Sequence, residues 1–122
     1  MIAGNKGSDT INVGSTASNN GSVAGGMGLD TILLNASVVN WVNGGAGTDS
    51  IAVSAGSSFS TLGGGGLGDT ITFASTFAGG KVYGDAIGTT TVGTGTEGAA
   101  DGNDSITVVG ATTAGGLSLI HI

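Results

Sequence analysis

The sequence predicts an all-β fold, a parallel β-solenoid (a β-roll or β-helix) of about five coils with about 20 residues each. A motif of aspartate, a hydroxyl residue, isoleucine, any residue and a large apolar residue starts at Asp9, Asp30, Asp49, Asp69 and Asp104. The first four copies are separated by 21, 19 and 20 residues, and the fifth follows after 35. No segment has the apolar period of a capped helix. The near-constant step is typical of one supersecondary unit stacked on the next.

The residues after each aspartate predict a half-buried strand. Isoleucine stands two residues after the aspartate and Val, Leu or Phe stands four residues after it, with a mostly small or polar residue between them. This alternation has the period of two that a strand requires. The hydroxyl residue directly after each aspartate should point outward, and stacked hydroxyl pairs contribute about 0.2–1 kcal/mol each.

A second short strand is expected before each glycine-rich run. Ile2, Val23, Val42 and Leu62 lie seven residues before the first four aspartates and should point inward. The glycine-rich residues between the two strands, such as 25–29 and 44–48, indicate a tight turn, because repeated glycine marks positive φ or close backbone approach. The turn should recur from coil to coil.

The sequence predicts a single solenoid segment over residues 1–116 that belongs to a longer repeat array. The chain is interpreted as a metagenomic fragment of the protein that contains this array. A Thr- and Gly-rich insertion is expected at about residues 86–101, where the repeat is late. Residues 117–122 resemble the translated end of a sequencing transposon and are interpreted as a non-native tail. The ends of such a segment would expose strand edges, so we expect contact with adjacent repeats or end-to-end self-association.

Composition excludes several classes of function. Eight acidic residues and only two basic ones give a net charge of −6, so a nucleic-acid surface is not expected. No apolar run is long enough for membrane insertion. The chain has no cysteine and its only histidine lies in the tail. Because the aspartates are repetitive rather than gathered at one place, the sequence predicts no enzyme.

Two copies match a known calcium-binding pattern. Gly25-Gly26-Met27-Gly28-Leu29-Asp30-Thr31-Ile32-Leu33 and Gly44-Gly45-Ala46-Gly47-Thr48-Asp49-Ser50-Ile51-Ala52 both read G-G-x-G-x-D-x-U-x, with U a large aliphatic residue. The chain thus resembles the RTX (hemolysin-type) calcium-binding nonapeptide repeats of secreted and surface proteins of bacteria. The resemblance implies Ca²⁺ bound in the turns along one edge.

The resemblance also implies a set of ligands. These would be the carboxylates of Asp30 and Asp49 with the backbone carbonyls of Gly25, Met27, Gly44 and Ala46. The turns before Asp9, Asp69 and Asp104 depart from the motif, and these aspartates are further candidate ligands. The motif occurs once per coil, so only one edge would hold ions.

Two functions follow from these patterns. The first is an extracellular or cell-surface structural module of bacteria, such as an adhesin, a surface-layer protein or an RTX-like stalk, with calcium locking its turns. The alternative is a metal-free structural solenoid of a phage fibre or cell-surface spine, held by its isoleucine and threonine ladders.

Overall fold

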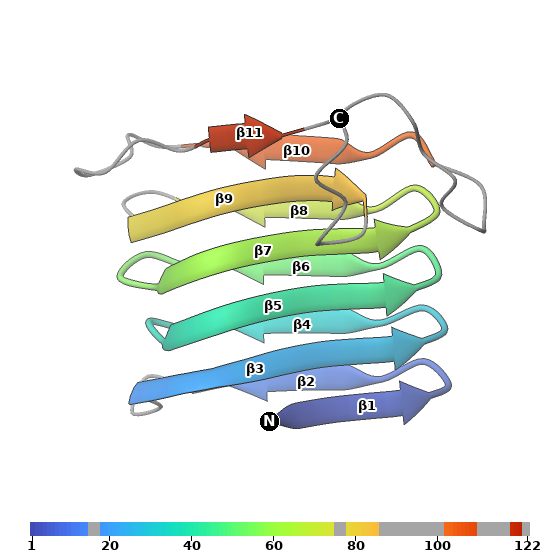
Figure 1. Cartoon of the computed structure of the whole chain (residues 1–122), viewed down its shortest axis with the longest axis horizontal. Helices are drawn as coiled ribbons and strands as arrows, with labels where there is room; N and C mark the ends of the chain where they lie inside the picture. The colour runs from blue at the N-terminus through green and yellow to red at the C-terminus, as the bar shows by residue number, and fades with distance from the viewer. Residues whose placement is uncertain (15–17, 75–77, 86–101, 110–117, 121–122) are drawn as a thin grey trace.

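The fold is described from a computed structural model, which covers residues 1–14, 18–74, 78–85, 102–109 and 118–120 (Figure 1). This part of the chain forms strands without helices. The strands are β1 (Ile2–Lys6), β2 (Thr10–Val13), β3 (Ser18–Met27), β4 (Thr31–Leu34), β5 (Val38–Ala46), β6 (Ser50–Val53), β7 (Ser58–Gly66), β8 (Thr70–Phe73), β9 (Ala78–Asp85), β10 (Ser105–Val108) and β11 (Ser118–Ile120).

The strands form two parallel sheets that stack one coil on the next (Figure 1). One sheet has the order β1-β3-β5-β7-β9-β11, and the other has the order β10-β8-β6-β4-β2. Equivalent repeat positions pair in register: Ile11 pairs with Ile32, Ile32 with Ile51, and Ile51 with Ile71. The predicted parallel β-solenoid is therefore confirmed.

The core lies between the two sheets and is built from columns of aliphatic side chains. Ile32, Ile51 and Ile71 are fully buried on one sheet, and Val42 and Leu62 are fully buried on the other. Burial of each such side chain stabilises the fold by about 1.5–3 kcal/mol. The inward direction predicted for both strands of the coil is thus confirmed. The hydroxyl residues that begin the short strands lie outside the core.

The glycine-rich run differs from the expected turn. Strands β3, β5 and β7 were expected to be short, but they are the longer strands of their coils because they continue through the first residues of the run. The bend is therefore confined to the two residues before Asp30, Asp49 and Asp69. Gly26, Gly45 and Gly65 pair with one another across coils although their φ angles are 120°, 121° and 124°. The strands extend this far because glycine tolerates positive φ while its backbone still pairs with the next coil.

The long step between the last two copies does not break the stack. Strand β10 pairs with β8 in the same register that joins the earlier coils, with Ile106 opposite Ile71. The insertion expected at 86–101 lies outside the described residues. Within the tail expected at 117–122, Ser118–Ile120 form β11 and pair with β9.

Candidate functional site: an aspartate ladder

The five aspartates of the repeat stack at one position, directly before the short strands. We call Asp9, Asp30, Asp49, Asp69 and Asp104 the aspartate ladder. The side chains of the three middle members are buried, with 1–2% of their surface exposed. The two outer members are half-buried. The predicted column of carboxylates thus exists, and its middle part is enclosed within the turn rather than displayed to solvent.

A hydrogen bond joins each aspartate to the next. The backbone N–H of Asp9 donates to Oδ1 of Asp30 at 2.8 Å, and the backbone N–H of Asp30 donates to Oδ1 of Asp49 at 2.8 Å. The series continues from the Asp49 N–H to Asp69 Oδ1 at 2.7 Å and from the Asp69 N–H to Asp104 Oδ1 at 2.8 Å. Each of the last four carboxylates therefore bridges its own coil and the preceding one, and all four bonds run in the same direction along the stack.

The backbone reinforces the same contact. The N–H after each of the last four aspartates donates to the aspartate carbonyl of the preceding coil, as from Thr31 to Asp9 at 2.8 Å and from Ser50 to Asp30 at 2.8 Å. Side chain and main chain together therefore satisfy the polar groups of the bend between coils. The same aspartate is held from both neighbouring coils.

The other carboxylate oxygen of the buried aspartates lies against a glycine. Oδ2 of Asp30 and Oδ2 of Asp49 are buried and accept no hydrogen bond from the described residues. A Cβ atom added to Gly25 would come within 2.6 Å of Asp30 Oδ2, and one added to Gly44 would come within 2.5 Å of Asp49 Oδ2. The first glycine of the motif is thus required by the carboxylate that packs on it.

This contact between the first glycine and the aspartate was not predicted from the sequence, although a signal for it is present. A glycine stands five residues before Asp9, Asp30, Asp49 and Asp69 alike, including the copies that depart from the calcium motif. The second glycine is less constant, because Asn5 takes its place in the first coil with φ 81°. The position that meets the carboxylate is thus glycine in all of the first four copies, and in the fifth coil Gly84 of β9 lies against Asp104 Oδ2.

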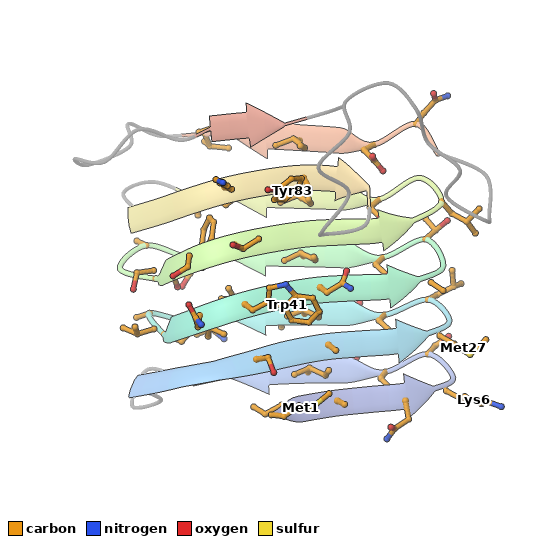
Figure 2. The ribbon with its side chains drawn as sticks, in the orientation of Figure 1. Met1, Lys6, Met27, Trp41 and Tyr83 are labelled. Atoms are coloured by element: carbon orange, nitrogen blue, oxygen red, sulfur yellow. The ribbon has the colours of Figure 1, made fainter. Side chains whose placement is uncertain are left out.

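The structure separates the proposed calcium ligands into two groups. Gly25 and Gly44 are buried beneath the carboxylates of Asp30 and Asp49. Met27, at the end of β3 (Figure 2), and Ala46 are exposed. Their carbonyl oxygens accept hydrogen bonds from the N–H groups of Gly7 and Gly28, both at 2.8 Å. A carbonyl oxygen has two lone pairs, so each of these oxygens keeps one further acceptor position.

Burial dominates the electrostatics of Asp49. Desolvation raises the pKa of the Asp49 carboxyl, and the hydrogen bond from the Asp30 backbone N–H lowers it. The neighbouring Asp30 carboxylate raises this pKa again by charge repulsion. Adjacent strands lie about 4.8 Å apart, where two ionised carboxylates repel by about 3.5 kcal/mol at an effective dielectric constant of 20. The ionised form of Asp49 is therefore disfavoured.

A second polar column, which the sequence analysis did not identify, lies at the opposite bend. Ser37 and Ser57 are buried there. The backbone N–H of Ser37 donates to Ser57 Oγ at 3.4 Å, and Ser57 Oγ donates to the Leu34 carbonyl at 3.0 Å. The signal is a serine directly before β5 that recurs 20 residues later directly before β7. This column closes the coil on the side away from the aspartates.

Among the described residues, no three His, Cys, Asp or Glu side chains come together in a group that could hold a metal ion. That part of the chain also has no helix long and apolar enough to cross a membrane.

Comparison with protein-family models, with curated proteins and with solved structures gives no match for this chain.

Proposed function

We propose that this chain is a structural repeat module of an extracellular or cell-surface protein of bacteria, in which the aspartate ladder locks successive coils. The observation that supports this role is the series of four hydrogen bonds from one aspartate to the next. Each bond satisfies a backbone donor at a bend, where an unpaired buried donor would cost about 1–3 kcal/mol. The repeated module would act as a rigid spacer.

The ladder supports this role without requiring a metal. From the second coil onward, the aspartate carboxylate contacts the backbone of the preceding coil, and in Asp49 it also packs on the glycine of its own turn, so it defines the shape of the turn and the spacing between coils. A spacer of this kind needs a constant rise per coil, and parallel strands provide it at about 4.8 Å. The geometry therefore favours the hypothesis of a metal-free structural solenoid, as in a fibre or a surface spine.

A pair of variants at Asp49 tests the structural role. Asp49→Asn keeps an oxygen that can accept from the Asp30 N–H, whereas Asp49→Ala removes it, and neither variant has the charge. The alanine variant should be less stable than the asparagine variant by about 1–3 kcal/mol, measured by denaturant unfolding in the presence of a chelator. Equal stability of the two variants would show that the hydrogen bond does not hold the coils.

Calcium binding is the second candidate function, and one observation favours it. Oδ2 of Asp30 and Oδ2 of Asp49 are buried oxygens without a hydrogen-bond donor, and an ionised buried oxygen is costly unless a cation or proton neutralises it. Ca²⁺ prefers carboxylate and carbonyl oxygens. The residues that would hold it are Asp30 and Asp49 with the carbonyls of their turns.

Thermal unfolding with calcium and with chelator separates the two candidates. A site occupied at 100 times its dissociation constant would stabilise the fold by about 2.7 kcal/mol, and Asp49→Asn should reduce this gain. A melting temperature that is the same with calcium and with chelator would exclude calcium and leave the structural role intact. A chain that folds only with calcium would exclude the metal-free spacer.

A further inference from the structure

The outer face of the long sheet carries an aromatic and a basic side chain that the aspartate ladder does not use. Each of β5, β7 and β9 has a fully buried aliphatic residue near its middle, at Val42, Leu62 and Val82. Successive side chains of a strand point to opposite faces, so the residue before each of these points outward. We call these three residues the outer row: Trp41, Thr61 and Lys81.

The outer row places an indole, a hydroxyl and an ammonium group in one line across the strands. Trp41 pairs in register with Thr61, and Thr61 pairs with Lys81. Because neighbouring strands lie about 4.8 Å apart, the backbones of Trp41 and Lys81 are about 10 Å apart. Trp41, on β5 (Figure 2), is half-buried, and Lys81 is exposed. The sheet therefore fixes the indole and leaves part of it to contact a ligand.

The surroundings of Trp41 are polar. Asn40 is exposed beside it, and Asn43 lies two residues further on the same face. Oδ1 of Asn43 is buried and accepts no hydrogen bond from the described residues, so this amide has an acceptor position left for a donor. Tyr83, two residues after Lys81, is a second half-buried aromatic residue on this face (Figure 2). The face thus combines aromatic rings with amide and hydroxyl groups.

This combination fits a sugar better than a protein partner. A protein interface has an apolar centre of several large side chains, and no large hydrophobic residue that is exposed in the described part of the chain belongs to the outer row. A pyranose ring has a C–H face that stacks on an indole and a rim of hydroxyls that bond to amide and hydroxyl groups. One indole among polar side chains therefore matches a sugar ring.

The charge of the outer row selects the class of sugar. The aspartates of the ladder lie at the bend, and the three middle ones are only 1–2% exposed. The outer row carries a single charge, the positive charge of Lys81, which favours an anionic group on the ligand. The separation of Trp41 and Lys81 is close to the length of two linked pyranose rings. A carboxylate on a neighbouring sugar unit would thus lie near Lys81.

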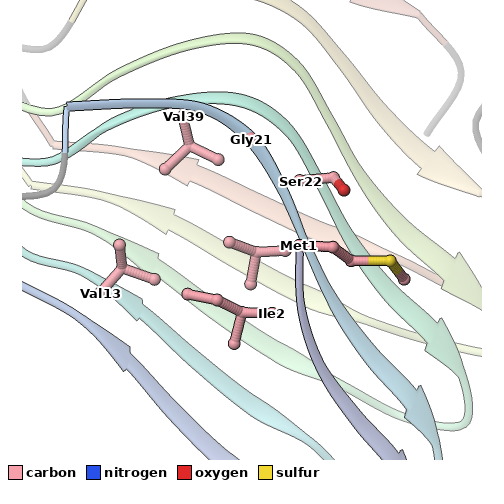
Figure 3. Close-up of a pocket in the computed structure, with 7 residues that line it drawn as sticks. Met1, Ile2, Val13, Gly21, Ser22 and Val39 are labelled. Atoms are coloured by element: carbon pink, nitrogen blue, oxygen red, sulfur yellow. The ribbon is translucent and has the colours of Figure 1, made fainter.

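A ligand of the outer row would lie across the sheet rather than inside the fold. The pocket that Figure 3 shows is lined by residues that include Met1, Ile2 and Val13, and its volume is about 90 Å³. Pockets that enclose small ligands have volumes of roughly 300–1,000 Å³. An extended polymer needs no such pocket, because it can follow the outer row from coil to coil.

We propose that the outer row binds a polysaccharide of uronic acids, laid along the solenoid axis across β5, β7 and β9. One sugar ring stacks on Trp41, hydroxyls of the chain contact Thr61 and Asn43, and a carboxylate pairs with Lys81. The site goes beyond the structural function and does not depend on how the ladder holds the coils. Loss of binding would leave the structural function standing, and equal stability of the two Asp49 variants would leave the binding site standing.

Fluorescence tests the contact directly, because Trp41 is the only tryptophan of the chain. Alginate and polygalacturonate are polymers of uronic acids, and with chelator present at least one of them should shift the emission of Trp41 and shield it from acrylamide. Trp41→Ala should weaken binding about tenfold or more in isothermal titration calorimetry, whereas Trp41→Phe should keep most of the affinity. Binding of neither polymer, or equal binding by Trp41→Ala, would overturn the proposal.

A second pair of variants tests the charge. Lys81→Gln should weaken binding of the uronate polymer about two- to fivefold and should not change binding of the same polymer with its carboxylates esterified. Lys6→Gln is the matched control, because Lys6 is also exposed but lies at the end of β1 (Figure 2). Added salt should weaken binding of the acidic polymer. Equal effects of the two substitutions, or equal affinity for the acid and the ester, would refute an acidic ligand.

Sedimentation velocity without polymer tests the other possible occupant, a second copy of the chain. The unaltered chain and Trp41→Ala should sediment alike, because the outer row binds sugar and not protein. Self-association of the unaltered chain that Trp41→Ala abolishes would assign the outer row to a contact between copies and overturn the proposal. Circular dichroism of each variant confirms that it has folded.

Discussion

Replacing Asp49 by asparagine should make the solenoid more stable at neutral pH. Asp49 is 2% exposed and lies between Asp30 and Asp69 in the aspartate ladder. Its ionised form is repelled by each ionised neighbour by up to about 3.5 kcal/mol at an effective dielectric constant of 20. Asparagine removes this repulsion and keeps an oxygen for the Asp30 N–H. Its amide nitrogen loses hydrogen bonds to water at a cost of about 1–3 kcal/mol.

The net gain from Asp49→Asn at about pH 7 should be on the order of 1 kcal/mol, which corresponds to about 4 °C in melting temperature for a chain of this size. The gain must depend on pH. Because the pKa of Asp49 is raised above 3.8 in the folded state, the folded chain binds more protons than the unfolded chain just above that pH. Stability of the unaltered chain should therefore fall as pH rises through the folded pKa, by at most about 1.4 kcal/mol per pH unit for this group.

The assay is thermal unfolding followed by circular dichroism at about pH 4.5 and about pH 7, with chelator present throughout. Asp49→Asn should melt higher than the unaltered chain at the upper pH and lose that advantage at the lower pH. Asp9→Asn is the control, because Asp9 is half-buried and has one neighbour in the ladder. An advantage of Asp49→Asn that is equal at both pH values, or absent at the upper one, would refute the argument from repulsion.

Three further substitutions test the turn and the core. Gly44→Ala should destabilise the fold by about 3 kcal/mol or more, because the added Cβ would meet the carbonyl of the next coil and Asp49 Oδ2. Gly66→Ala is the control, because the Cβ position there is open space. It should unfold at nearly the same denaturant concentration as the unaltered chain. Leu67→Gly should stabilise the fold by about 0.5 kcal/mol, because Leu67 has φ 73° and glycine relieves about 1–2 kcal/mol of backbone strain at such an angle. This relief exceeds the entropic cost of glycine. A lower denaturant midpoint of the variant would contradict this prediction. Phe73→Ala should destabilise the fold by about 3–5 kcal/mol. Phe73 is fully buried, and its ring stacks on that of Phe59 with the ring centroids 5.8 Å apart. A loss of stability under about 1 kcal/mol would mean that the core collapses around the cavity.

Much of the fold could be predicted because its information is local and repeated. The alternation from Thr31 to Leu34 specifies which side chains point inward, and repetition of the same pattern 19 residues later specifies which strand pairs with which. One-residue slips would turn every isoleucine outward, so the register follows from the pattern. Even the delayed fifth copy takes the expected place beside β8, because pairing depends on the strand and not on the length of the connection.

The candidate site was predicted by position but not by arrangement. The sequence places one aspartate in every turn, and the ladder confirms that column. It does not reveal that Oδ1 of Asp30 accepts from the backbone of the preceding coil, or that Oδ2 lies on Gly25. Both contacts depend on the side-chain direction in a stacked turn. The Ser37–Ser57 bond was missed for the same reason.

The sequence by itself therefore determined the class of fold, the length of the coil, the strand register and the column of five aspartates, because each follows from a period that a single strand or turn must satisfy. Only the tertiary structure decided what the aspartates do. Once the coils stack at their fixed separation, the carboxylate of one coil reaches the backbone of the preceding coil, the glycine beneath it has no room for a side chain, and burial raises the pKa of Asp49. These are distances between coils, and no single repeat contains them.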